Sequence, residues 1–206
     1  MYRKYFKRII DFVFAFILLF CTLPVFLLCS IFLLVTNNGK IFFTQERPGK
    51  DEFFIKIIKF KTMNDNKDQN GNLLTDKERL FCIGKFLRKT SLDELPQLIN
   101  VLKGDMAIIG PRPLLIRYLP YYTIEERKRH RIRPGITGLS QISGRNNLTW
   151  NERLALDIEY VDKLSFYLDL KIVFKTIVNI ILRKDIVIVP NTSMKDLDDE
   201  RKQNNL

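Results

Sequence analysis

The sequence predicts an α+β fold, in which a re-entrant membrane helix precedes a small β-hairpin and several amphipathic helices. Three observations support this prediction: a long uncharged segment near the N-terminus, two strand-like segments around a turn, and helical periodicity over much of the remainder. We expect a membrane-anchoring helix over residues 1–38, a folded domain over 39–190 and a polar flexible tail over 191–206.

The composition narrows the classes of partner. The 206 residues include 34 Lys and Arg against 23 Asp and Glu, so the formal net charge is +11. Such a basic surface favours nucleic acid, anionic lipid or a phosphorylated substrate. Cys21, Cys29 and Cys82 show neither metal-ligand spacing nor a disulfide framework, which fits a reducing compartment.

The N-terminal segment is long enough to enter a membrane. From Phe12 to Val35 there are 24 successive residues without a charge. A helix of this length exceeds the roughly 30 Å hydrocarbon core of a bilayer. It is also longer than the apolar region of a cleaved signal peptide, and no cleavage site follows it.

The charges around this segment favour a re-entrant helix over a spanning one. Basic residues lie on both sides of it, and Lys and Arg keep their flank in the cytoplasm. These residues are Arg3, Lys4, Lys7 and Arg8 before the segment and Lys40, Arg47, Lys50, Lys56, Lys59 and Lys61 after it. Pro24 lies near the middle, where it removes a backbone hydrogen bond and favours a kink. Thr22 could satisfy the freed carbonyls; a spanning helix remains the alternative because spanning helices tolerate proline.

The rest of the chain reads as a hairpin followed by helices. Residues 41–47 and 53–63 are strand-like and flank the turn Pro48-Gly49-Lys50-Asp51. A polar loop covers 64–76, and helical patterns cover 77–89, 92–103, 124–131, 150–163 and 166–184. The last helix is either a core helix or one that lies in a membrane interface with its lysines toward the headgroups.

Two adjacent carboxylates, Asp93 and Glu94, invite two interpretations. Ser91 followed by Glu94 is the capping-box pattern of a helix start. Pro96 indicates that the helix could begin at Asp93 instead. Taken alone, the segment favours a capping role over catalysis, because caps are common at helix starts.

Several basic motifs could handle a phosphate. Arg112 stands between two prolines in Gly110-Pro111-Arg112-Pro113, so its planar guanidinium projects from stiff backbone. A second element runs from Arg133 through Gly135 and Gly138 to Arg145, and its glycines allow backbone to approach a ligand. A basic run over 127–133 looks like a solvated helix face. No nucleic-acid-binding motif accompanies it, so we expect no nucleic-acid partner.

Nucleophilic chemistry has few candidates. His130 is the only histidine, and its arginine neighbours oppose protonation without placing it near a nucleophile. The chain has no Walker A sequence, no G-x-S-x-G and no histidine pair. A nucleophile would therefore be a carboxylate, a serine or a cysteine.

Four motifs, in order and closely spaced, carry a family resemblance. They are KFKTM (59–63), RKTSLDELPQLINVLKGDM (88–106), GPRPL (110–114) and RPGITGLSQISGR (133–145). Together they closely resemble the bacterial sugar transferase family, the monotopic polyprenyl-phosphate phosphoglycosyl transferases. The resemblance covers roughly residues 1–185 and is greatest to the small PglC-type enzymes.

The resemblance implies an activity and a location. Members transfer a phospho-sugar from a UDP-sugar to undecaprenyl phosphate and release UMP, as the first membrane step of glycoconjugate biosynthesis. The mechanism is ping-pong through a covalent aspartyl phospho-sugar, with Mg²⁺ as cofactor. The sugar implied is N-acetylated, such as N,N′-diacetylbacillosamine. The location is the cytoplasmic face of the bacterial inner membrane in a monotopic arrangement, with membrane lipid and downstream glycosyltransferases as further partners.

The resemblance also assigns roles to particular residues. Residues 39–190 become the catalytic domain, with Asp93 as the nucleophile and Glu94 as its catalytic partner. The phosphate and nucleotide contacts fall on Lys59, Arg88, Arg112 and Arg145, and the magnesium ligands on Asp93 and Asp157. The chain departs from the family pattern at Leu23, Ala107 and Ser140.

Two other functions remain open on the residues alone. One is a membrane-anchored binding protein whose basic surface holds anionic lipid or nucleic acid. The other is a magnesium-dependent nucleotide-sugar hydrolase, in which water replaces the lipid acceptor.

Overall fold

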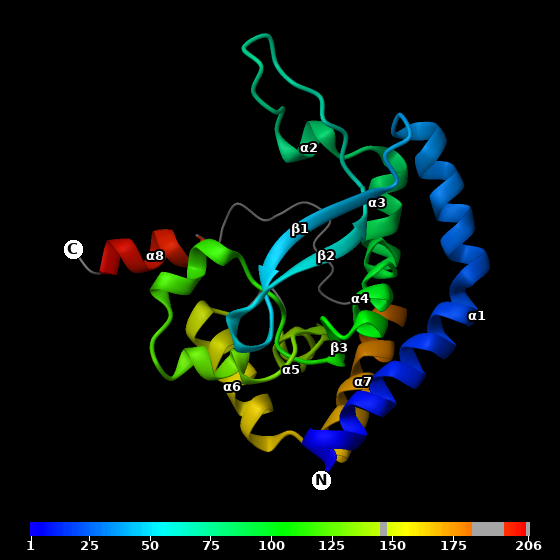
Figure 1. The fold of residues 1–206 in the computed structure, drawn as a ribbon. Coiled ribbons are helices and arrows are strands. Elements are labelled where there is room, and N and C mark those ends of the chain that lie inside the picture. Colours follow the sequence, from blue (N-terminus) through cyan, green and yellow to red (C-terminus); the bar gives the residue numbers. More distant parts are fainter. Residues whose placement is uncertain (145–147, 183–195, 205–206) are drawn as a thin grey trace.

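The structure, a computed structural model, describes residues 1–144, 148–182 and 196–204 (Figure 1). It has the predicted α+β character, with a long apolar N-terminal helix and a small antiparallel hairpin. The elements that position the site are the hairpin, the segment around Asp93, and two loops that cross beneath Arg112.

Helix α1 (Lys7–Thr36) follows a π-helical turn η1 (Tyr2–Phe6). Its 30 residues extend for about 45 Å. Among the described residues it is the one helix long and apolar enough to cross a membrane, by length and composition, and only 11% of its most apolar window is buried. Helix α1 continues through Pro24, and its ribbon bends along its length (Figure 1).

The expectation that Thr22 satisfies the carbonyl freed by Pro24 is wrong. The hydroxyl of Thr22 donates to the carbonyl of Leu18 at 2.7 Å. Pro24 has no N–H, so the carbonyl that loses its donor is that of Phe20, four residues earlier. The hydroxyl of Thr22 therefore reinforces the preceding turn and does not replace the missing bond.

The predicted hairpin consists of β1 (Phe42–Pro48) and β2 (Phe54–Phe60), joined through a short turn η2 (Lys50–Glu52). The strands are antiparallel, with Gln45 opposite Ile57 and Phe43 opposite Lys59. The second strand ends at Phe60, three residues before the predicted end. Alternate residues of β1 share one face of the strand.

The helix predicted over 77–89 is two helices, α2 (Asp76–Arg79) and α3 (Cys82–Lys89). Leu80 between them has an extended backbone and forms an isolated β-bridge with Met63. Gly84 of α3 lies directly on the backbone of Thr62, where a Cβ would come within 2.0 Å of the carbonyl oxygen. This contact places α3 against the end of β2.

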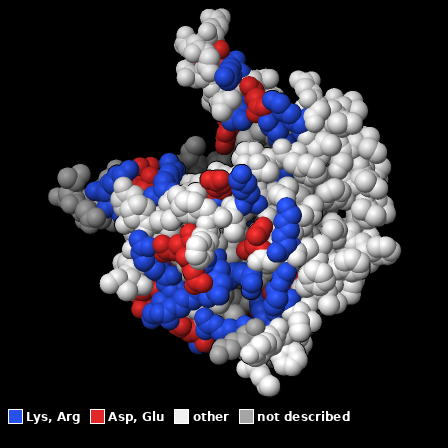
Figure 2. Space-filling view, in the orientation of Figure 1, with Lys and Arg blue, Asp and Glu red and all other residues white. Residues whose placement is uncertain are grey.

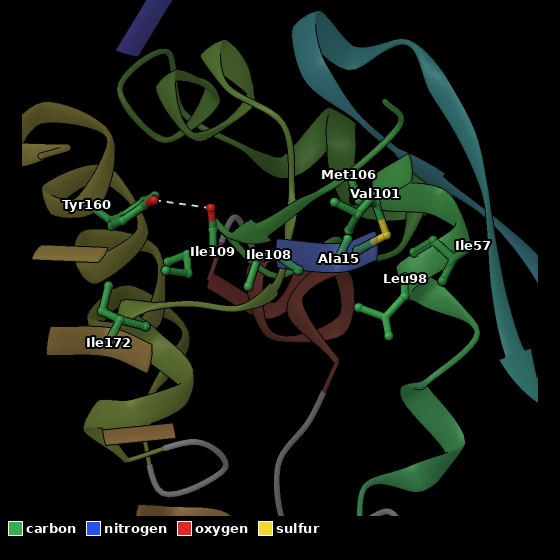
Figure 3. Packing of buried hydrophobic residues seen from close by; sticks show 9 residues of the cluster. All are labelled: Ala15, Ile57, Leu98, Val101, Met106, Ile108, Ile109, Tyr160 and Ile172. Atoms are coloured by element: carbon green, nitrogen blue, oxygen red, sulfur yellow. Dashed lines mark hydrogen bonds between the residues drawn. The ribbon is translucent and has the colours of Figure 1, made fainter. Parts of the chain in front are cut away.

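A 3-10 turn η3 (Leu92–Glu94) and helix α4 (Gln97–Lys103) come next. They are followed by a short parallel pair that the sequence did not predict, β3 (Ala107–Ile109) with β4 (Gly135–Thr137). The main core surrounds α4 and β3 (Figure 3). Its buried members are Ala15, Ile57, Leu98, Val101, Met106, Ile108, Ile109, Tyr160 and Ile172.

The remaining elements are helical. They are η4 (Ile116–Tyr121), η5 (Glu126–Arg131), α5 (Leu139–Ser143), α6 (Trp150–Lys163), α7 (Phe166–Ile181) and α8 (Leu197–Asn204). Ile172 of helix α7 is fully buried, as the core interpretation requires, while Tyr167 and Phe174 are largely exposed. The membrane-interface interpretation stays a prediction. The predicted last two residues of α7 lie outside the described ones.

The expected flexible tail is wrong for the part of it that the structure describes. Helix α8 is docked: Leu197 is fully buried, and Arg201 forms an ion pair with Glu126. Leu197 packs in a second core cluster with Trp150 and Tyr118. The prediction rested on the polar composition of the tail and overlooked Leu197, the buried residue that anchors helix α8.

Helix α1 is fixed to the domain near its N-terminal end. Lys7 forms ion pairs with Asp11 and with Asp169 of α7, both at 3.0 Å. Arg8 donates to two carbonyls at the end of α4. Ala15 is fully buried in the main core, whereas the opposite edge of α1 is apolar and exposed, and appears white in Figure 2.

Candidate active site

The segment around Asp93 is not a conventional helix start. Ser91 has a left-handed backbone (φ +57°), which is uncommon for a residue with a side chain. Its hydroxyl caps nothing, so the capping-box prediction is wrong. Asp93 and Glu94 lie in the 3-10 turn, and Pro96 separates them from α4. Strained backbone of this kind concentrates at functional sites.

Glu94 is held by two cations. Lys59 Nζ of β2 and Arg112 Nη2 both donate to Glu94 Oε1, at 2.7 and 3.1 Å. Burial raises the pKa of Glu94, but Lys59 and Arg112 outweigh that effect and hold the pKa at about 2. Glu94 is therefore ionised and fixed in place.

Asp93 has a different environment. Burial, and then the charge of Glu94, raise the pKa of Asp93 to about 6, although Lys59, Arg88 and Arg112 oppose the shift. Within the described part of the chain, its carboxylate has no hydrogen bond and no ion pair. The environments of the two acids thus differ: Glu94 is engaged by two cations, whereas the carboxylate of Asp93 is unpaired within the described residues.

Arg88 joins two of the sequence motifs. It lies in the last turn of α3, and its Nε donates to the hydroxyl of Thr62 at 2.9 Å. Thr62 belongs to the motif that begins at Lys59, so Arg88 and Lys59 both act on the carboxylate of Asp93, whose pKa each of them lowers. Arg145, the fourth predicted phosphate contact, lies outside the described residues.

Arg112 projects from a crossing of two glycine-containing loops. A Cβ on Gly110 would lie 2.5 Å from the carbonyl oxygen of Arg133, and one on Gly135 would lie 2.0 Å from the nitrogen of Gly110. Gly135 therefore has a packing role, and it also lines the pocket beside Glu94, so the expectation that its backbone approaches a ligand stays a prediction. These glycines let the two loops cross, and the crossing sets the position of Arg112.

Asp157, predicted as a magnesium ligand, is already occupied by protein groups. It is 1% exposed on α6, and Arg129 Nη2 donates to its Oδ2 at 2.7 Å. Ser140 donates to the other oxygen at 2.8 Å. Arg129 also donates to the backbone carbonyl of Arg112 at 2.6 Å. Asp157 thus supports Arg112 through Arg129, and both of its oxygens already have protein partners. The magnesium role predicted for Asp157 and Asp93 stays a prediction.

The basic run over 127–133 is not a solvated face throughout. Arg129 and His130 are both buried. Burial, and then the charge of Arg129, lower the pKa of His130 to about 4, so the expected resistance to protonation is confirmed. His130 contacts the backbone of Gly49 through Nδ1, away from both acids of the pair.

A pocket of about 70 Å³ opens beside Glu94. Lys59, Arg112 and Glu94 line it together with Gln45 and Arg47 of β1, two residues that the site prediction missed. Alternation along 41–47 could have found them, since residues two apart share a strand face. In the view of Figure 2, acidic and basic side chains gather in the middle of the visible face, beside the white edge of α1.

The acidic pair fits a magnesium ion in its donor chemistry. Mg²⁺ prefers carboxylate oxygens and retains several waters. Glu94 Oε1 is taken by two cations, which leaves its other oxygen and the unpaired carboxylate of Asp93. Among the described residues, no cluster of three or more potential metal-ligating side chains includes Asp93, so Glu94 is the carboxylate that would share an ion with it.

Comparisons with known proteins indicate the same family as the four sequence motifs. The sequence profile described as "Bacterial sugar transferase" matches residues 2–183. An uncharacterized sugar transferase of Bacillus subtilis is 46% identical, with 87% of this chain and 89% of that protein aligned. The exopolysaccharide production protein ExoY of Sinorhizobium fredii is 39% identical over 83% of both chains.

A third relative has a more specific name. The UDP-glucose:undecaprenyl-phosphate glucose-1-phosphate transferase of Caulobacter vibrioides is 36% identical, with 83% of this chain and 68% of that protein aligned. The matching profile covers the apolar helix, the acidic pair and the crossing loops alike. On this evidence the chain is an enzyme that belongs to the bacterial sugar transferase family.

Proposed function

We propose that this enzyme transfers a phospho-sugar from a UDP-sugar to undecaprenyl phosphate and releases UMP. One observation carries the proposal: the unpaired carboxylate of Asp93 lies among Lys59, Arg88 and Arg112 while its neighbour Glu94 is fixed. A carboxylate can approach a negatively charged diphosphate only where such cations offset the repulsion. The name of the Caulobacter vibrioides relative supports the lipid acceptor.

The first displacement forms a covalent intermediate. An oxygen of Asp93 attacks the phosphorus that carries the sugar, and the bond from that phosphorus to the bridging oxygen breaks. The bridging oxygen leaves with UMP and keeps the bonding electron pair. Lys59 and Arg112 are positioned to stabilise the charge that develops on the phosphate oxygens.

The second displacement regenerates the carboxylate. An oxygen of undecaprenyl phosphate attacks the same phosphorus, and the bond to Asp93 breaks. Two successive displacements let a soluble donor and a lipid acceptor use one site in turn. Mg²⁺ held by Asp93 and the free oxygen of Glu94 would neutralise phosphate charge.

The reaction requires a membrane surface. Helix α1 presents a long apolar edge, and α7 exposes Phe174, Ile177 and Ile181. We propose that α1 enters the cytoplasmic face of the inner membrane and returns to it, which makes the protein monotopic. Downstream glycosyltransferases would then extend the lipid-linked sugar as the first step of glycoconjugate synthesis.

The test is intact-protein mass spectrometry of the detergent-solubilised enzyme with Mg²⁺ and a UDP-sugar but no lipid. The panel comprises UDP-glucose, UDP-galactose, UDP-N-acetylglucosamine and UDP-N,N′-diacetylbacillosamine, of which we propose that an N-acetylated sugar is accepted. A mass gain of one phospho-sugar is expected for the wild type and for Asp162→Asn, an exposed carboxylate of α6. Asp93→Asn should show none.

Other outcomes separate the remaining functions. UMP release that needs lipid but leaves no adduct would refute the covalent route in favour of direct transfer. Release of UMP and sugar phosphate without lipid would indicate a hydrolase. Salt-sensitive lipid binding without UMP release would indicate a binding protein. Chelation with EDTA should abolish adduct formation, and added Mg²⁺ should restore it.

A further inference from the structure

Arg47 has an unusual environment for a partly buried cation. It lies on β1, and its Nη2 donates to Gln45 Oε1 at 2.6 Å. Among the described residues this neutral amide is its only hydrogen-bond partner, and no carboxylate lies within ion-pair distance. Partly buried arginines are normally paired with an anion, because burial of an uncompensated charge is unfavourable.

A second guanidinium lies close by. Burial, and then the charge of Arg112, lower the pKa of Arg47 to about 10. Arg112 forms an ion pair with Glu94, and the same carboxylate also pairs with Lys59. The described lining of the pocket therefore holds three cations and one carboxylate. The excess of positive charge predicts an anionic ligand.

The pocket has the size of an anion, not of a whole substrate. Its volume of about 70 Å³ is several times the roughly 10–15 Å³ that one water molecule needs, but is far below what a nucleotide-sugar fills. Gln45 and Arg47 lie two residues apart on β1, so they share one face of the strand, and both line the pocket. The hydrogen bond from Arg47 to Gln45 fixes the planar fork of the guanidinium, and such a fork suits phosphate oxygens.

From this geometry we propose that Arg47 and Arg112 together bind the phosphate of the nucleotide donor that leaves in UMP, with Gln45 orienting Arg47. This inference deepens the proposed function and rests on it for the identity of the donor. The phosphate bonded to the sugar must lie beside Asp93, whereas the pocket extends from Glu94 toward Arg47. The neighbouring phosphate of the donor is the group that such an extension would reach.

The test compares Arg47→Gln with Arg47→Lys and with the control Lys50→Gln. Lys50 is half-exposed in the turn of the same hairpin, so its variant removes one positive charge nearby without touching the pocket. For Arg47→Gln we expect the KM for the UDP-sugar to rise, and the calorimetric affinity for UMP to fall, by about 10- to 100-fold, as for loss of one charge-assisted hydrogen bond. Arg47→Lys should lie between the two.

The lipid acceptor provides the second arm. The KM for undecaprenyl phosphate and the Tm should stay close to wild type in all three variants. A rise confined to the lipid KM would overturn the donor assignment and give the phosphate site to the acceptor. Unchanged UMP affinity in folded Arg47→Gln would overturn the site itself. UMP binding needs no turnover, so it tests Arg47 even if the covalent mechanism fails.

Discussion

Asp157→Asn separates a supporting role for Asp157 from the magnesium role that the resemblance implies. The substitution preserves shape but leaves Arg129 buried without its counter-charge; the two side chains are 1% and 2% exposed. Breaking a buried ion pair by changing one partner costs about 3–5 kcal/mol. For a protein of this size, each kcal/mol lowers the Tm by about 2–4 °C. We therefore expect a fall of about 6–20 °C.

The fluorescence of Trp150 makes the measurement direct. It is the only tryptophan in the chain, it is 5% exposed, and it begins the helix that carries Asp157. The matched control is Glu159→Gln on the same helix, which breaks an exposed pair with Lys163. Exposed pairs contribute about 0–1 kcal/mol, so the Tm of the control should change by at most about 4 °C.

Activity completes this test. Because Arg129 also supports the backbone of Arg112, Asp157→Asn should raise the KM for the UDP-sugar at saturating Mg²⁺. The supporting role would be refuted by a Tm within about 2 °C of wild type together with a higher Mg²⁺ requirement. That pair of results would show that Asp157 binds the metal.

Three further predictions concern Lys59, Asp93 and Leu197. Lys59→Met removes one of the two cations on Glu94. In a UMP-release assay it should lower kcat/KM by about 10²- to 10³-fold, as loss of a transition-state donor does. The control Lys40→Met, which removes an exposed lysine paired with Asp65, should leave kcat/KM unchanged. Only ionised Asp93 can attack, so adduct formation should fall as the pH drops through about 6, and a flat profile there would contradict the assignment. Leu197→Ala should cost about 2–5 kcal/mol by fluorescence-detected unfolding, because Leu197 is fully buried; Ile124→Ala, 91% exposed, is the control, and equal effects would show that α8 is not docked.

The sequence predicted the elements whose signals are local. The hairpin around Pro48-Gly49 and the long apolar helix were evident from periodicity and turn residues, and both are present. Their boundaries differ by a few residues, as strand and helix ends usually do. The acidic pair also drew attention in the sequence, but its predicted function came from the family resemblance and not from the segment itself, and it stays a prediction.

What the sequence did not predict depends on contacts between distant segments. The pair β3 and β4 has three residues in each strand, too short for a periodic signal, and forms because Gly110 and Gly135 let the backbones touch. The local sequence favoured a capping box between Ser91 and Glu94, but the side chain of Glu94 instead forms ion pairs with Lys59 and Arg112. Tertiary ion pairs thus outweighed the local preference.

The contacts of α1 connect the proposed membrane helix to the chemistry. Arg8 donates to carbonyls at the end of α4, the helix that follows the acidic pair. Asp11 accepts a hydrogen bond from the backbone nitrogen of Ile108 at 3.2 Å, in the strand that leads to Arg112. The segments that carry Asp93, the proposed nucleophile, and Arg112, the proposed phosphate contact, are therefore both attached to one turn of α1. A helix tethered only by a flexible linker would let the site drift relative to the bilayer. These short polar contacts instead fix the distance between Asp93 and any membrane that α1 enters, as transfer to a lipid phosphate at a set depth requires.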